Sequence, residues 1–421
     1  MIPLTTLQGL PPEEIRALIA DRLVHIWGAG DVGLDVLTSL QRSGVEVSGF
    51  LHTQPAPDAT YRGLPVRPVE QVLNADARKA GVFVVIASAQ FLKTAEARCR
   101  EAGLEAQRDY LSYLALRRPV AVIEVASRPG AAAPYGTFVA APDTDKALSL
   151  EDFQRALARI EQDQPCLCHV ELSWLGDPLW NPALAQIVAH CEQTTPCTVT
   201  TTLPHCETLE AVLAAGPSRF NLLAYGYGAG YEAQMGVAWS DFLARLDRLK
   251  ALARNNAGRT RFLLRYQQTA GDDPQTAEQW RALLAGSGIG LSVEVPYLMP
   301  YDPLLDHAAG APLALPVQQA VARLTWQLQA TLDLSLQDRD HPCLSQRVFP
   351  VVGADLSVGV CHLYQEPRLA ADYMNCSWDK LIEQRAESTQ CTRCQEHGLH
   401  RLDLAVLTRR YPTIAPKLFK D

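Results

Sequence analysis

The sequence predicts an α/β protein of several domains, and three observations support this. Near the start of the chain, the glycine-rich turn G-A-G-D-V-G at residues 28–33 joins an apolar strand to a helix. From residue 119 onward, six apolar segments alternate with amphipathic helical patterns, and such alternation indicates a parallel sheet with helices packed on its outside. After residue 336 this pattern gives way to a segment that contains five of the eleven cysteines.

Composition limits the classes of function. The 421 residues are 48% hydrophobic and 20% charged, which suits two or three globular domains. A net charge of −8 argues against binding to nucleic acid or to an anionic membrane surface. No apolar run approaches the roughly 20 residues that span a bilayer, and the first ten residues lack a secretory signal pattern. We therefore expect a cytoplasmic protein, whose odd number of cysteines favours metal ligands or buried thiols over disulfides.

The first predicted domain covers residues 1–118. A strand at 23–27 leads into Gly28, Gly30 and Gly33, a helix follows, and a second strand spans 45–51. In this context the glycines permit a tight turn, and the N-terminus of the helix offers N–H groups to a phosphate. The domain resembles the small Rossmann-like domain that precedes some sugar-modifying acyltransferases, which implies a nucleotide or nucleotide-sugar ligand. His52 stands where an acidic residue would hold a ribose hydroxyl, so a domain used only for packing or dimerisation is the alternative.

The second predicted domain covers residues 119–335 and contains the six strand–helix repeats. The final strand, at 291–295, is followed by a predicted helix at 317–330. Six repeats are too few for a closed eight-stranded barrel. An open partial barrel and a doubly wound sheet both fit this pattern. The predicted strands are 121–126, 169–174, 198–202, 220–224, 261–266 and 291–295.

One segment after the second of these strands carries a motif. Residues 174–182, W-L-G-D-P-L-W-N-P, resemble the G-G-E-P-L-x-N-P segment of radical S-adenosylmethionine (SAM) enzymes. In that family the backbone and the acidic residue of this segment hold the amino group of the SAM methionine. The resemblance implies a partial (β/α)6 TIM barrel and assigns Gly176 and Asp177 to ligand binding. Residues 224–236 are similar to a further glycine-containing loop of the same family.

The loop after the first barrel strand departs from the family at the decisive positions. Radical SAM enzymes carry C-x3-C-x2-C here, and this chain has Pro129, Ala133 and Gly136 in place of the three cysteines. These side chains contain no metal-ligating atom. The reaction needs a [4Fe–4S] cluster with one open iron position, so standard reductive cleavage of SAM is not expected. Whether SAM still binds is left open.

The third predicted domain covers residues 336–421 and contains Cys343, Cys361, Cys391 and Cys394 in the spacing C-x17-C-x29-C-x2-C. A β-hairpin is predicted at 347–361, and a hairpin beside a C-x2-C pair can bring four thiolates to one metal. The segment resembles the SPASM or twitch extension of radical SAM enzymes, which implies an auxiliary [4Fe–4S] cluster. His400 and Leu404 occupy the positions of two further family cysteines, so one cluster is expected. Zn²⁺ is the alternative, because a four-thiolate site suits both.

Two alternatives at this segment stay open. His397 and His400 could complete a C-x2-C-x2-H-x2-H zinc site, although this histidine spacing is shorter than usual. The cysteines could also hold no metal. The other cysteines, among them Cys376, are interpreted as buried thiols.

Two functional hypotheses follow. In the first, the chain is a radical SAM-like protein that works without radical chemistry, as a binding or partner subunit that holds one auxiliary [4Fe–4S] cluster. Its ligand would be a nucleotide or nucleotide sugar, and its partner another protein or a second copy of the chain. In the second, it is an enzyme of altered mechanism that acts on a nucleotide sugar or a peptide, with the cluster used for electron transfer or for structure.

Overall fold

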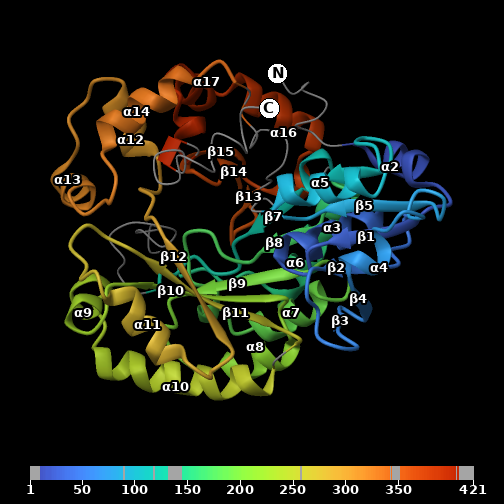
Figure 1. The fold of residues 1–421 in the computed structure, drawn as a ribbon. Helices are drawn as coiled ribbons and strands as arrows, with labels where there is room; N and C mark the ends of the chain where they lie inside the picture. The colour runs from blue at the N-terminus through green and yellow to red at the C-terminus, as the bar shows by residue number, and fades with distance from the viewer. Residues whose placement is uncertain are drawn as a thin grey trace. The chain divides into compact units, whose positions relative to one another are not determined.

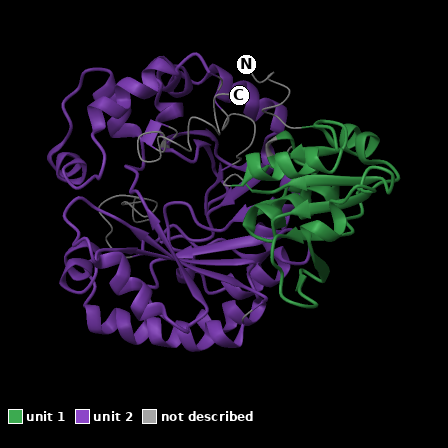
Figure 2. Ribbon diagram, in the orientation of Figure 1, with its two compact units in different colours: residues 1–119, 161–169, 413–421 green, residues 120–160, 170–412 purple. Residues whose placement is uncertain are grey.

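The computed structural model describes residues 10–88, 91–116, 119–130, 145–256, 258–341, 343, 351–403 and 405–406. The chain forms two compact units, coloured separately in Figure 2. Unit 1 comprises Met1–Pro119 with Glu161–His169 and Thr413–Asp421, and unit 2 comprises Val120–Ile160 with Val170–Pro412. None of the helices in the described parts of the chain is long and apolar enough to cross a membrane.

Unit 1 is built on a six-stranded sheet with the order β3-β4-β2-β1-β5-β6. The β1 strand pairs in parallel with β2 and β5, and only the short pair β3–β4 is antiparallel. From β1 the chain adds strands first on one side, through β2 and β4, and then on the other, through β5 and β6, so the topological switch point lies between β1 and β5, as in Rossmann-like folds. The strands are β1 Leu23–Trp27, β2 Gly49–His52, β3 Thr60–Tyr61, β4 Leu64–Pro68, β5 Val82–Ile86 and β6 Tyr110–Ser112. The helices are α2 Pro12–Ile19, α3 Asp31–Arg42, α4 Val69–Val72 and α5 Leu92–Glu101, with a 3-10 turn η1 at Tyr113–Ala115.

Unit 2 contains a sheet in which six strands follow one another in chain order, β12-β11-β10-β9-β8-β7. The neighbouring pairs from β8 to β12 are parallel. A doubly wound sheet would reverse its strand order at a switch point, so that alternative is wrong and the sheet is that of an open partial barrel. The strands are β7 Val120–Ile123, β8 His169–Glu171, β9 Cys197–Thr201, β10 Arg219–Tyr225, β11 Arg261–Gln267 and β12 Ile289–Glu294.

Helices connect these strands, and Figure 1 shows α8, α10 and α11 lying along one side of β9–β12. The helix predicted at 317–330 is instead divided between α13 and α14, with residues 322–327 in neither helix, so that prediction was wrong. Proline occupies the first turn of both α12 and α13, where its missing N–H is not needed, and each proline therefore begins a new helix. The helices are α6 Leu150–Asp163, η2 Pro178–Trp180, α7 Leu184–Cys191, α8 Leu209–Ala215, α9 Ala229–Met235, α10 Trp239–Asn255, α11 Thr276–Leu284, α12 Asp302–Ala308, α13 Leu315–Val321 and α14 Leu328–Gln337.

The C-terminal hairpin extends the barrel sheet beyond its first strand. The β13 strand pairs in parallel with β7, with Val351 opposite Val122, and β13, β14 and β15 then form an antiparallel series. The turn between β13 and β14 confirms the predicted hairpin, although positions 347–350 lie outside the described residues. The elements are β13 Val351–Val352, β14 Val358–Cys361, β15 Tyr364–Ala370, η3 Tyr373–Asn375, α16 Trp378–Glu387, α17 Thr389–Glu396 and η4 Leu399–Arg401.

Candidate functional site

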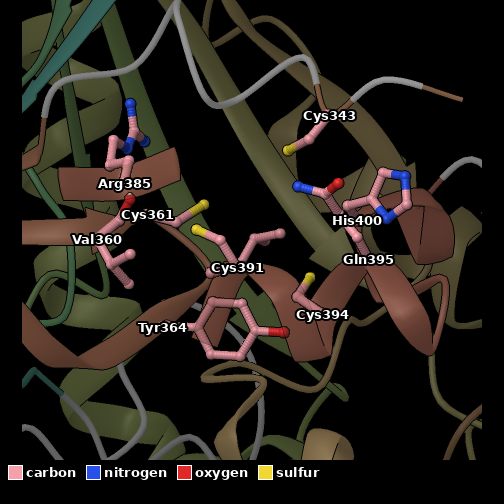
Figure 3. A pocket seen from close by; sticks show the side chains of 10 residues that line it. Cys343, Val360, Cys361, Tyr364, Arg385, Cys391, Cys394, Gln395 and His400 are labelled. Carbon is pink, nitrogen blue, oxygen red and sulfur yellow. Dashed lines mark hydrogen bonds between the residues drawn. The ribbon is translucent and has the colours of Figure 1, made fainter. Parts of the chain in front are cut away.

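The four cysteines of the C-terminal segment line one pocket. Cys343 follows α14, Cys361 ends β14, and Cys391 and Cys394 both lie on α17. Figure 3 shows their four sulfur atoms around the same space. Residues three apart on a helix share one face, and this is how α17 presents two thiols to the pocket. The rest of the lining is formed by Val360, Leu363, Tyr364, Arg385, Gln395 and His400.

A buried arginine contributes positive charge to this pocket. Arg385 on α16 is only 3% exposed, and its Nε donates a hydrogen bond of 2.6 Å to the carbonyl oxygen of Val360. Burial raises the pKa of the Cys391 thiol, and the Arg385 guanidinium opposes that shift. A fixed positive charge stabilises thiolates, which are the form of cysteine that binds metals.

Burial dominates the chemistry of the second thiol on α17. It raises the pKa of Cys394 to about 12, while Tyr364 acts in the opposite direction. Cys394 is therefore protonated at neutral pH as the site stands, and a metal must displace the proton when it binds. Among the described residues, no three His, Cys, Asp or Glu side chains stand close enough together to hold a single ion. The four thiols that line the pocket are nevertheless the ligand type of a four-thiolate cluster or of Zn²⁺, and they would have to move closer together to bind either.

The histidines of the alternative zinc site are placed differently from each other. His400 lines the pocket, and its Nε2 lies 2.8 Å from the carbonyl oxygen of His341. Burial lowers the pKa of His400, so this ring stays neutral more readily than an exposed histidine. His397 and Cys376 are not among the lining residues.

Asp177, the expected ligand of a SAM amino group, is enclosed within the protein. It is 0% exposed. Its carboxylate accepts hydrogen bonds from the backbone N–H groups of Leu179 and Thr202, at 3.1 and 2.8 Å. The hydroxyls of Thr201 and Thr202 donate to it at 2.8 to 2.9 Å. Burial raises the pKa of Asp177 and these donors lower it, so the carboxyl group is already engaged with the protein.

The backbone of the loop after β7 covers this carboxylate. A Cβ atom at Gly130 would collide with Thr202 Oγ1 and approach Asp177 Oδ2. The loop is fixed on both sides, since the Asp177 N–H donates to the Arg128 carbonyl at 2.8 Å and Trp180 Nε1 donates to the Pro129 carbonyl at 2.9 Å. Pro129 therefore contributes its backbone to the closure of this site, whereas Ala133 and Gly136 lie outside the described residues.

Gly176 has a packing role in the same region. A Cβ at Gly176 would collide with the Ala126 carbonyl oxygen, so only glycine allows the two loops to approach this closely. Its N–H donates to Glu124 Oε1 at 2.9 Å, and the N–H of Leu175 donates to the same atom at 3.0 Å. Glu124 was missed in the sequence, although one acidic residue within the apolar run at 120–126 was a signal for it.

Polar side chains also gather on one face of the barrel sheet. Arg265 on β11 forms a bidentate pair with Glu294 on β12, at 2.8 to 3.0 Å. Glu171 on β8 accepts from Ser173 and Thr200, and burial raises its pKa while Arg265 opposes that shift. Glu171 and Glu294 are the last residues of β8 and β12, and Arg265 lies within β11.

The glycine-rich turn of unit 1 has structural reasons for its glycines. Gly28 has a φ of +123°, and a Cβ at Gly33 would collide with the Gly28 carbonyl oxygen. Gly30 precedes α3, and its carbonyl accepts a hydrogen bond of 3.3 Å from Tyr61. Asp31 places an acidic group in the first turn of α3, where its charge would oppose a bound phosphate. Nucleotide binding at Gly28, Gly30 and Gly33 stays a prediction.

No protein-family model matches the chain, and no curated protein matches its sequence. SuiB of Streptococcus suis bound to its precursor peptide SuiA is one similar solved structure, with 12% identity, a TM-score of 0.42, and coverage of 73% of this chain and 79% of that chain. Native anSMEcpe with bound AdoMet gives 12% identity, a TM-score of 0.44, and coverage of 72% and 99%. BtrN in complex with AdoMet and 2-DOIA gives 10% identity, a TM-score of 0.37, and coverage of 66% of this chain and 87% of that chain. These likenesses are weak, and the fold follows from the strand order itself: an α/β protein with an open partial barrel.

Proposed function

We propose that this chain is a radical SAM-like protein that works without the radical reaction, as a binding or partner subunit holding one [4Fe–4S] cluster. Cys343, Cys361, Cys391 and Cys394 would be its ligands, and the cluster would supply one-electron transfer or a structural cross-link. The single observation that carries the proposal is the convergence of these four thiols on one pocket beside the buried Arg385. A four-thiolate site of this kind suits iron–sulfur clusters and is compensated by a nearby cation.

The enclosure of Asp177 supports the absence of radical chemistry. Its carboxylate already accepts from two backbone N–H groups and two hydroxyls, and the Gly130 backbone lies against it. To hold a SAM amino group, Asp177 would have to lose partners that are costly to leave unsatisfied in a buried site. We expect the partial barrel to bind its ligand elsewhere.

The polar face of the barrel sheet favours the second candidate, an enzyme of altered mechanism acting on a nucleotide sugar or a peptide. Glu171 on β8, Arg265 on β11 and Glu294 on β12 are ionisable groups of one sheet with shifted pKa values. Ionisable groups with shifted pKa values are more frequent in functional sites than elsewhere.

The deciding experiment is anaerobic reconstitution followed by analysis of iron, sulfide and zinc. About four irons per chain supports the proposal, and about eight would show that a second cluster binds and that the argument from the loop at residue 129 is wrong. Zinc without iron would replace the cluster by a structural zinc site. In the variant Cys391→Ser the iron content should fall sharply, whereas Cys206→Ser, a half-buried thiol on another loop, should leave it unchanged.

Calorimetry separates the two candidate functions. The proposed binding subunit should give no heat with SAM, because Asp177 is engaged. Titration with UDP-type and NAD-type ligands tests binding at the glycine-rich turn of unit 1, and turnover of a sugar nucleotide or peptide would favour the enzyme.

A further inference from the structure

A tyrosine hydroxyl in the cysteine pocket makes no hydrogen bond of normal length, and its neighbour there is the weakly accepting thiol of Cys394. Tyr364 begins β15 and is 3% exposed. Its hydroxyl oxygen is buried and has no hydrogen-bond partner within normal distance among the described residues. A buried hydroxyl without a partner loses its hydrogen bonds to water and gains none in return, which is destabilising. Such a group calls for an explanation.

The hydroxyl points into the metal pocket. Figure 3 shows it directed toward Cys394, and both residues line the pocket. Burial raises the pKa of Tyr364, and Cys394 adds to that shift, which places the thiol beside the phenol. The hydroxyl is therefore next to a sulfur that is a proposed metal ligand.

A neighbouring tyrosine shows that this region satisfies its hydroxyls. The ring of Tyr301 lies 6.1 Å from the ring of Tyr364 in an edge-on contact. The Tyr301 hydroxyl donates to the carboxylate of Asp403, so it has its acceptor within the protein. Tyr364, unlike Tyr301, lines the cysteine pocket.

We propose that Tyr364 is a positioning residue of the metal site, whose hydroxyl donates a hydrogen bond to the Cys394 sulfur once that sulfur is a metal-bound thiolate. This inference rests on the proposed four-cysteine site. A thiolate is a far better acceptor than a thiol, so loading the site would turn the weak acceptor beside the hydroxyl into a strong one. Hydrogen bonds to ligand sulfurs make a cluster easier to reduce, because they stabilise the more negative state.

The variant Tyr364→Phe tests this by removing one oxygen atom while keeping the ring and its packing. After anaerobic reconstitution, its iron and sulfide contents should equal those of the wild type. In a dye-mediated titration followed by electron paramagnetic resonance, the preference of the cluster for its reduced state should fall by about threefold to tenfold. For a one-electron couple this is a midpoint potential lower by about 30 to 60 mV. The control Tyr231→Phe alters a buried tyrosine on α9 and should leave the potential unchanged.

Each outcome of this experiment has one meaning. An unchanged potential in Tyr364→Phe at full iron content overturns the role of Tyr364 and leaves the proposed cluster intact. Loss of iron in that variant also overturns it, because the hydroxyl would then be needed to build the site. If the wild type itself takes no iron and no zinc, the proposed site fails and the inference fails with it. If zinc is the metal, the measurement is the affinity for Co²⁺ in competition with zinc instead of a midpoint potential. Tyr364→Phe should then bind Co²⁺ about threefold to tenfold more weakly than the wild type.

Discussion

Replacing Asp177 distinguishes a structural carboxylate from a ligand-binding one. In Asp177→Asn, the amide oxygen can take the place of Oδ2 and keep the bonds from Thr202. The amide NH2 then faces the N–H of Leu179, which now donates to Oδ1 at 3.1 Å. One buried backbone N–H is left without an acceptor, at a cost of about 1 to 3 kcal/mol.

The variant Asp177→Ala removes both carboxylate oxygens and predicts a larger loss of stability. The hydroxyls of Thr201 and Thr202 can rotate to other acceptors, but the N–H groups of Leu179 and Thr202 cannot. Two unsatisfied N–H groups predict a loss of about 2 to 6 kcal/mol in the free energy of unfolding. The exposed Asp247→Asn serves as a control and should change stability by less than about 0.5 kcal/mol.

The assay is urea denaturation of the full chain, paired with calorimetric titration of SAM for each variant. We expect stability to fall in the order wild type, Asp177→Asn, Asp177→Ala, with no SAM binding to lose. The reasoning is refuted if Asp177→Asn is as stable as the wild type while it abolishes a SAM affinity that the wild type possesses.

Three further predictions concern stability. His25 on β1 has its pKa lowered to about 4 by burial and by the charge of Arg67. Its ordinary value is about 6.5, so the unfolded chain takes up the proton first, and the wild type should lose about 3 kcal/mol as the pH falls from 6.5 to 4. Urea midpoints measured across this range should show a smaller loss in His25→Leu. Gly33→Ala should unfold at a lower temperature, because the new Cβ meets the Gly28 carbonyl oxygen, whereas Gly230→Ala on α9 meets nothing and should be neutral or stabilising by up to about 1 kcal/mol. An equal effect of the two glycine variants in thermal unfolding would contradict the close packing at Gly33. Glu124→Gln keeps an acceptor for the N–H groups of Leu175 and Gly176 and should cost less than about 1 kcal/mol, while Glu124→Leu should cost about 2 to 5 kcal/mol in the same urea assay.

The sequence predicts the parts of this fold that depend on local pattern. Alternating strand and helix patterns give the α/β class and the six barrel strands, and the glycines at 28–33 mark the first turn. The division of the predicted helix at 317–330 was missed because amphipathic periodicity does not show where a helix is interrupted. Pairing of β13 with β7 joins residues far apart in the chain, which no local pattern reveals.

At the candidate site, too, the sequence predicts some features and not others. The spacing of the four cysteines identifies them, and they line one pocket. Nothing in the sequence shows which buried groups surround them, so Tyr364 and Arg385 emerge only from the structure. The motif around Asp177 identifies an acidic residue at a strand end. It does not show that the carboxylate oxygens already accept hydrogen bonds from donors within the protein.

The pairing of β7 with β13 has a consequence for how the protein is made. Val122 emerges early from the ribosome, and its partner Val351 is synthesised more than two hundred residues later. At about 5 to 20 residues per second, the outer edge of β7 waits on the order of ten seconds or more for its neighbour. An apolar strand edge left open for that time can pair with another nascent chain. Production of this protein should therefore depend on chaperone capacity, and a chain that ends before β13 should aggregate rather than yield an isolated barrel.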